Sequence, residues 1–161
     1  RVTAGLMWVA RCALSHDGLR HQLQGGTLRR AYLAGCEGVP VPRRGCAEAP
    51  IARAPGSVLK REVNPQGAPA RTHYEVLATG RGRSLVALRL DAGRPHQIRV
   101  HLAHLGCPLV GDFLYGEETE ELPDRFALHS AAIWLRQPIT GDGIVRRSPL
   151  PEALAGLLGG R

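Results

Sequence analysis

The stretch of residues 93–116 constrains this chain most, because it joins a helical pattern to a glycine-rich turn. It reads Gly-Arg-Pro-His-Gln-Ile-Arg-Val-His-Leu-Ala-His-Leu-Gly-Cys-Pro-Leu-Val-Gly-Asp-Phe-Leu-Tyr-Gly. Pro95 suits the first position of a helix, and Gly106 suits its end. Apolar side chains recur between them at the spacing of one helical face, at Ile98, Leu102 and Leu105. The stretch therefore predicts a short helix followed by a turn at Gly111-Asp112.

Arg99 is placed unusually within this predicted helix. It follows the inward-facing Ile98 directly, which puts it at the edge of the packed face. An unpaired buried charge costs several kcal/mol, so Arg99 needs an anionic partner, either a carboxylate or a phosphate. A structural ion pair or a solvated arginine remains the alternative interpretation. We expect Asp112 to act as an Asx-type turn residue that satisfies backbone donors.

The charge of the chain favours a polyanionic partner. Its 161 residues hold 21 Lys and Arg against 14 Asp and Glu, a formal net charge of +7, and Lys60 is the one lysine. Arginine makes planar, bidentate contacts with phosphate and stacks on bases, which favours RNA or DNA over a simple electrostatic surface. A high-GC coding sequence would produce the same excess of arginine.

Cysteine and histidine spacing gives little support for a metal site. The four cysteines form no CxxC pair and are interpreted as free thiols in a reducing compartment; they are Cys12, Cys36, Cys46 and Cys107. His101 and His104 share a helical face close to His96, but no further ligand has matching spacing. We expect no metal. No apolar run approaches the length of a membrane span, and no signal peptide is evident.

Strand patterns outnumber helical ones along the rest of the chain. We predict strands at residues 5–11, 27–36, 71–78, 84–90, 126–135 and 144–147, and further helices at residues 15–23, capped by Ser15, and 151–158. Tyr32 and Arg30 share one face of the second strand. Residues 37–69 are rich in Pro, Gly and Arg and predict one long, partly mobile excursion with a short strand near Ile51. The fold class is α+β, with a mainly antiparallel mixed sheet and flanking helices.

Residues 93–116 resemble the signature of the RluA family of RNA pseudouridine synthases. Other segments resemble the family in the expected order. These are Arg-Val-Thr-Ala-Gly-Leu at residues 1–6, Arg-Ala-Tyr-Leu-Ala at 30–34, Gly-Ala-Pro-Ala-Arg-Thr-His-Tyr-Glu-Val at 67–76 and Leu-His-Ser at 128–130. The resemblance covers essentially the whole chain.

The resemblance implies isomerisation of uridine to pseudouridine in ribosomal or transfer RNA in the cytoplasm, with no metal and no organic cofactor. Tyr32 would lie against the uracil and act as the general base, and Arg99 would pair with the catalytic aspartate. Leu6 would supply an apolar wall to the base. The remaining candidates for substrate or RNA binding, or for support of the helix entrance, are Arg30, Arg94, His96 and Gln97.

One departure from the family pattern concerns the catalytic aspartate. In the family it lies in a His-Arg-Leu-Asp segment immediately before the residues that correspond to Arg1 and Val2. None of the aspartates of this chain lies in that context; they are Asp17, Asp91, Asp112, Asp124 and Asp142. We therefore expect residues 1–161 to be part of a catalytic domain that is inactive alone and self-associates through an exposed sheet edge. The alternative is a noncatalytic RNA-binding remnant of the same fold.

Overall fold

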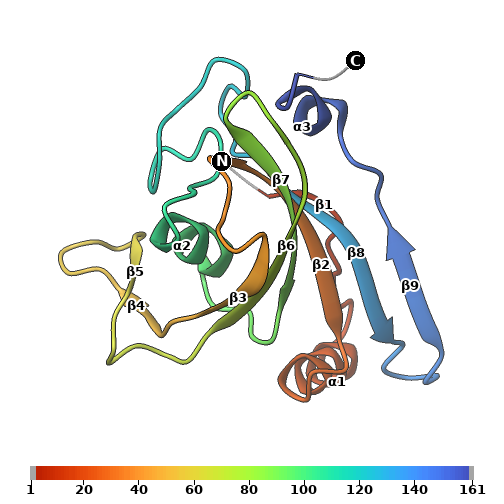
Figure 1. Cartoon of the computed structure of the whole chain (residues 1–161). Helices are drawn as coiled ribbons and strands as arrows, with labels where there is room; N and C mark the ends of the chain where they lie inside the picture. Colours follow the sequence, from red (N-terminus) through yellow and green to blue (C-terminus); the bar gives the residue numbers. More distant parts are fainter. Residues whose placement is uncertain (1–2, 160–161) are drawn as a thin grey trace.

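The computed structural model describes residues 3–159 of the chain (Figure 1). Its helices are α1 (Ala13–Gln24), α2 (Gln97–His104) and α3 (Glu152–Gly156). Its strands are β1 (Ala4–Gly5), β2 (Arg29–Glu37), β3 (Arg44–Glu48), β4 (Ile51–Arg53), β5 (Arg61–Val63), β6 (Arg71–Gly80), β7 (Arg83–Leu90), β8 (Leu128–Arg136) and β9 (Gly143–Arg147). Within the described residues, no helix has the length and apolar character of a membrane span.

Most of the strands form one seven-stranded sheet. Its order is β1-β8-β2-β7-β6-β3, and β9 pairs with β8. The pairing of β1 with β8 is parallel, whereas the other described pairings in this sheet are antiparallel. Strands β4 and β5 form a separate hairpin. The predicted α+β class with a mainly antiparallel mixed sheet is confirmed.

The main core lies between one face of the sheet and α2, as Figure 1 shows. Ala34 of β2, Val86 of β7 and Leu102 of α2 are fully buried there. Alternate residues of a strand face opposite sides of a sheet, so this contact defines an inner face that carries Tyr32, Ala34 and Leu88. Burial of apolar surface in this cluster fixes α2, and with it Arg99, against the centre of the sheet.

The prediction of a buried strand at residues 5–11 is wrong beyond Gly5. Strand β1 pairs with His129 and Ser130 of β8, and β9 pairs with β8 from Ala132 onward. Because β2 holds one edge of β8 and β9 takes the other from Ala132 onward, the chain after Leu6 has no free edge of β8 along which to continue as a strand. The side chains of Met7 and Val9 are 82% and 74% exposed.

The predicted helix positions are confirmed, but two of the predicted starting residues are wrong. Helix α1 begins after Cys12, which is its N-cap, so Ser15 lies inside the helix instead of capping it. Helix α2 begins after His96, whose left-handed backbone (φ 58°) places Pro95 before the helix. Both helices start without a side-chain cap, and the packing of their apolar faces fixes their position.

Residues 37–69 contain more regular structure than predicted. The strand near Ile51 is present as β4, but β3 and β5 were missed. Strand β3 gains its hydrogen bonds from β6, as an outer strand of the large sheet. The β4–β5 hairpin packs near α2, where Ile51 and Ala70 form a small buried cluster with Val100. Contacts between distant segments therefore order this region, and composition alone does not reveal them.

Candidate active site

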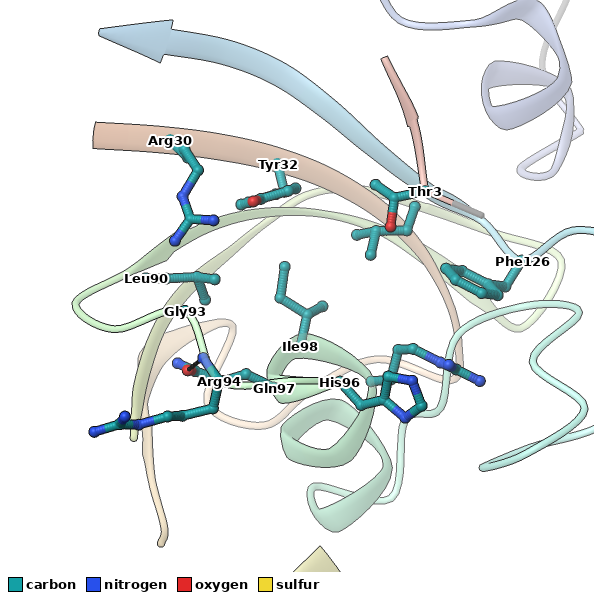
Figure 2. Close-up of a pocket in the computed structure, with 12 residues that line it drawn as sticks. Thr3, Arg30, Tyr32, Leu90, Gly93, Arg94, His96, Gln97, Ile98 and Phe126 are labelled. Carbon is teal, nitrogen blue, oxygen red and sulfur yellow. Dashed lines mark hydrogen bonds between the residues drawn. The ribbon is translucent and has the colours of Figure 1, made fainter. Parts of the chain in front are cut away.

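A pocket of about 290 Å³ lies between the inner face of the sheet and the start of α2. Strands β2, β7 and β8 form one wall, and the segment that enters α2 forms the other. Figure 2 shows Arg30 and Tyr32 extending from β2, with Gln97, Ile98 and His96 across the space from them. The lining residues are Thr3, Arg30, Tyr32, Leu90, Gly93, Arg94, His96, Gln97, Ile98, Arg99, Phe126 and Leu128.

The pocket brings together six of the seven site residues that the sequence predicts. They are Tyr32, Arg99, Arg30, Arg94, His96 and Gln97. Leu6 is the exception, because it lines a second cavity formed by α1, β8, β9 and the segment after β1. The Leu6 backbone N–H donates to the carbonyl of Ser130, which holds the segment on that side. In this structure Leu6 supplies no wall to the pocket that holds Tyr32.

Arg99 pairs with Asp112 inside the protein. Its Nε donates to Oδ2 at 2.7 Å and its Nη2 to Oδ1 at 2.6 Å, and Asp112 is fully buried. The sequence predicted a carboxylate or phosphate partner for Arg99 but gave Asp112 only a turn role. That turn role is also present, because the Leu114 N–H donates to Oδ1 at 3.1 Å. The need of a buried arginine for a carboxylate partner was the signal that could have identified Asp112.

Aromatic rings surround the guanidinium of Arg99. Its Cζ lies 4.5 Å from the ring centre of Phe126, 4.8 Å from that of Tyr115 and 5.9 Å from that of Phe113. A cation above an aromatic face is attracted by the ring, and the attraction increases when water is excluded. Asp112 and the rings together fix one orientation of the guanidinium, in which Nη1 makes no hydrogen bond with another described residue.

His96 lies at the edge of the pocket, where its surroundings favour the neutral imidazole. Tyr115 Oη accepts the backbone N–H of Arg61 at 2.8 Å and lies 2.9 Å from His96 Nδ1. A phenolic oxygen has one proton to donate and two acceptor sites, so Tyr115 Oη can hydrogen-bond to Nδ1 while it accepts from Arg61. Burial lowers the pKa of His96, and the positive charge of Arg99 lowers it further. This hydrogen bond was not foreseen from the sequence.

Gln97 holds the entrance of the helix through both ends of its amide. Its Nε2 donates to the carbonyl of Arg71 at 2.9 Å and to Thr72 Oγ1 at 3.1 Å. Its Oε1 accepts the backbone N–H of Arg94 at 3.0 Å. The side chain of Gln97 is buried and makes all three of these hydrogen bonds. Gln97 therefore supports the start of α2, which was one of its two predicted roles.

Two arginines at the pocket have no acidic partner among residues 3–159. The guanidinium of Arg30 packs on Gly93, where a Cβ would collide with it, and lies 5.5 Å from the ring centre of Trp8. Arg94 Nε donates to the carbonyl of Pro69 at 3.2 Å. Both cations are held by neutral groups, so their charges are not balanced by a neighbouring carboxylate and are available to an anion.

Among residues 3–159, those that line the pocket include no Asp or Glu. Within residues 3–159, no group of three or more His, Cys, Asp or Glu side chains is arranged to hold a metal ion. The pocket therefore combines a phenol, a neutral imidazole and three arginines, one of them already paired with Asp112. This arrangement suits the binding of an anionic substrate.

Comparison with known proteins identifies the family. A family model described as RNA pseudouridylate synthase matches residues 1–104. A ribosomal large subunit pseudouridine synthase D of Nitrosomonas europaea is 39% identical over 165 residues, covering 97% of this chain and 47% of that protein. The chain belongs to the RluA family of RNA pseudouridine synthases.

Further RluA-family comparisons agree in sequence and in fold. An uncharacterized RNA pseudouridine synthase, YjbO of Bacillus subtilis, is 39% identical over 160 residues, covering 99% of this chain and 56% of that protein. Human RNA pseudouridylate synthase domain containing 1 superposes with a TM-score of 0.72 at 28% identity, covering 88% of this chain and 62% of the human one. The chain spans about half the length of the curated relatives it matches.

Proposed function

We propose that this chain forms part of the catalytic domain of an enzyme that isomerises uridine to pseudouridine in RNA. The observation that carries the proposal is the meeting of Tyr32 and Arg99 in one pocket. These residues come from β2 and α2, far apart in the sequence, and the family resemblance gave each a catalytic role. Membership of the pseudouridine synthase family supports the same reaction.

The chemistry requires a base that is detached, turned and rejoined to the ribose through carbon. The target nucleotide must leave its stack to enter a pocket of this size. Arg30 and Arg94, which lack acidic partners among the described residues, would bind phosphates beside the target nucleotide and position it. The neutral His96 presents no positive charge of its own to the base.

Tyr32 is the proposed general base. It projects from β2 into the pocket, opposite the first turn of α2 (Figure 2). After the base is rejoined through carbon, a proton must leave that carbon, and the phenolic oxygen of Tyr32 is the proposed acceptor. The pocket offers no carboxylate of its own among its described lining residues for this task.

Arg99 is proposed to bridge two carboxylates. Asp112 occupies its Nε and Nη2 from behind, and Nη1 would face the catalytic aspartate near C1′ of the ribose, which acts as nucleophile or assists glycal formation. We propose that this aspartate belongs to a segment preceding Arg1. Residues 1–161, including the 37–69 excursion, would then form part of a catalytic domain. This part alone would be inactive. Asp112 is fully buried and already paired, so it is not the proposed nucleophile.

The proposed substrate is ribosomal RNA. Relatives 36–39% identical to this chain carry the name ribosomal large subunit pseudouridine synthase D, and transfer RNA is the alternative to be measured beside it. The proposed compartment is the cytoplasm, which is consistent with the four free cysteines.

A noncatalytic RNA-binding role is the second candidate. It is favoured by the same pocket, whose described lining combines unpaired arginines with no carboxylate. The two candidates differ in turnover and agree in RNA binding, so an activity measurement separates them.

Tyr32→Phe tests the proposed base in a form of the protein extended upstream through the aspartate-bearing segment. Loss of a general base lowers turnover by about 10²–10⁴-fold while RNA binding is retained. Tyr74→Phe is the matched control, because Tyr74 is a buried tyrosine of the same sheet outside the pocket. Equal turnover in Tyr32→Phe and Tyr74→Phe would overturn the assignment.

A further inference from the structure

Neighbouring arginines of β2 lie on opposite faces of the sheet. Arg30 lines the pocket with Tyr32 on the inner face. Arg29 precedes it and therefore points to the opposite side, with Ala31 and Leu33. The pocket uses only one of these two arginines, and the function of the other face is not explained by the active site.

The pairing register places more arginines beside Arg29 on this outer face. Ala31 pairs with Arg89 of β7 and with Ala132 of β8, and Ala132 pairs with Arg147 of β9. Directly opposite Arg29 lies Trp134, and Arg136 follows two residues later on the same face. We call this set the back-face patch: Arg29, Arg89, Arg136, Arg147 and Trp134. All four arginines are exposed.

The back-face patch lacks acidic neighbours over most of its area. Strands β7, β8 and β9 contain no Asp or Glu, and β2 contains only Glu37, its last residue, which is bonded to Arg83. Arg29 and Arg147 form no ion pair with any residue from 3 to 159, and Arg89 lies 3.8 Å from Asp91. Elsewhere the chain does pair its arginines, as Arg71 with Glu48 shows. On the β6 side, the exposed Glu75 shares this face opposite Ala87, so acidic groups lie near Arg89. The uncompensated positive charge of the patch therefore lies at Arg29, Arg136 and Arg147.

We propose that the back-face patch is a second RNA-binding surface, which holds the phosphate backbone of a structured RNA segment outside the target site. The inference rests on the proposed function only in taking RNA as the ligand. The floor between Arg89 and Arg147 is small and flat, because it consists of Ala31 and Ala132. Three strand spacings separate these arginines, about 14 Å, so they contact different phosphates.

The chemistry of the patch favours RNA over an acidic protein or a membrane surface. Arginine binds phosphate through two parallel hydrogen bonds, and an aromatic ring beside it offers a stacking surface to an unpaired base. Trp134 lies partly exposed opposite Arg29. Because the sheet separates the patch from the pocket, the target uridine cannot occupy both, and the patch must bind a different part of the same RNA.

The test compares two RNAs and three variants of this chain. The RNAs are a short single-stranded oligonucleotide with one uridine and a long hairpin that carries the same loop. The variants are Arg29→Gln/Arg147→Gln for the patch, Arg30→Gln/Arg94→Gln for the pocket, and Arg81→Gln/Arg125→Gln as a control with the same change of charge on exposed arginines elsewhere. Affinities are measured by fluorescence anisotropy over a range of salt concentrations.

The proposal predicts that the patch variant binds the long hairpin about tenfold more weakly than the wild-type chain. The slope of the logarithm of the binding constant against the logarithm of the salt concentration should become smaller in magnitude by about 2, since each lost phosphate contact removes about 1. The short RNA should bind the patch variant and the wild-type chain equally. If the patch variant and the control variant have the same salt slope on the long hairpin, the proposed RNA-binding role of the patch is wrong, and the patch has a different partner. A patch effect without any effect of the pocket variant would instead contradict the proposed pocket. No binding of either RNA by the wild-type chain would overturn both.

Discussion

Arg99 and Asp112 form a bidentate ion pair in the interior of the protein, with hydrogen bonds of 2.7 and 2.6 Å. Asp112 lies in the turn that follows α2, so the pair joins the helix to the segment leading to β8. The centres of three aromatic rings lie within 5.9 Å of the guanidinium carbon. Because Asp112 holds Nε and Nη2 of Arg99, the remaining nitrogen, Nη1, points in a defined direction.

Removal of Asp112 should destabilise the fold strongly. Asp112→Ala leaves a buried guanidinium without its anion, and breaking such a pair costs about 3–5 kcal/mol. The double variant Arg99→Met/Asp112→Leu should lose less than Asp112→Ala, because it removes both charges. Urea unfolding measures the difference, and equal losses in the two proteins would show that the unpaired charge is not the cause.

Arg99 should matter for turnover more than for RNA affinity. In the upstream-extended protein, Arg99→Lys keeps the positive charge but loses the guanidinium fork that we propose bridges Asp112 and the catalytic aspartate, and we expect turnover to fall by about 10²–10³-fold. Phosphate contacts elsewhere should keep the RNA dissociation constant nearly unchanged. Nucleoside analysis and anisotropy measure the two quantities, and a parallel loss of both would contradict the role of Arg99.

His101 should make the stability of the fold depend on pH. It is fully buried, with Nε2 2.9 Å from the carbonyl of Ala49 and Nδ1 2.8 Å from Thr72 Oγ1. Burial lowers the pKa of His101 below its ordinary 6.5, so on acidification the unfolded chain takes up the proton first. The free energy of unfolding should be constant well above pH 6.5 and fall below it.

Urea unfolding between neutral and mildly acidic pH measures this effect. Burial lowers the pKa of His96 in the same direction, so His101→Gln should reduce the pH slope without abolishing it. An unchanged slope in His101→Gln would show that another group carries the dependence.

Self-association of the 161-residue chain is expected from its exposed apolar surface and sheet edge. Met7 and Val9 are 82% and 74% exposed beside an apolar cavity of about 410 Å³. Surfaces of this kind associate with other chains. Sedimentation velocity should show concentration-dependent dimers or larger species, and Met7→Asp/Val9→Asp should shift them toward monomer. A wild-type chain that stays monomeric at all concentrations would contradict this expectation.

Local patterns predicted the central part of the fold well. Alternation on both sides of Gly80-Arg81-Gly82 predicted the hairpin of β6 and β7 because strand side chains alternate in burial. The position of α2 followed from its apolar spacing. Local patterns did not predict the pocket: the family resemblance implied the joint role of Tyr32 and Arg99, which line one pocket in the structure.

Features that depend on contacts between distant residues could not be predicted. Strand β3 needs the hydrogen bonds of β6, and its own residues, Arg-Gly-Cys-Ala-Glu, carry no strong strand pattern. The partner of His96 is Tyr115, 19 residues away. The position of Leu6 outside the pocket depends on competition between β1 and β9 for one edge of β8. These contacts depend on the arrangement of the whole sheet and cannot be inferred from a local segment.

Pseudouridine formation tests the central claim most directly. Unmodified ribosomal and transfer RNA would be incubated with the 161-residue chain and with a form extended upstream through the aspartate-bearing segment, and pseudouridine would be quantified in each. The account predicts product only with the extended form, and more on ribosomal RNA. Product from the 161-residue chain would contradict the placement of the catalytic aspartate. RNA binding without product in both forms would contradict the proposed enzyme and favour the noncatalytic role.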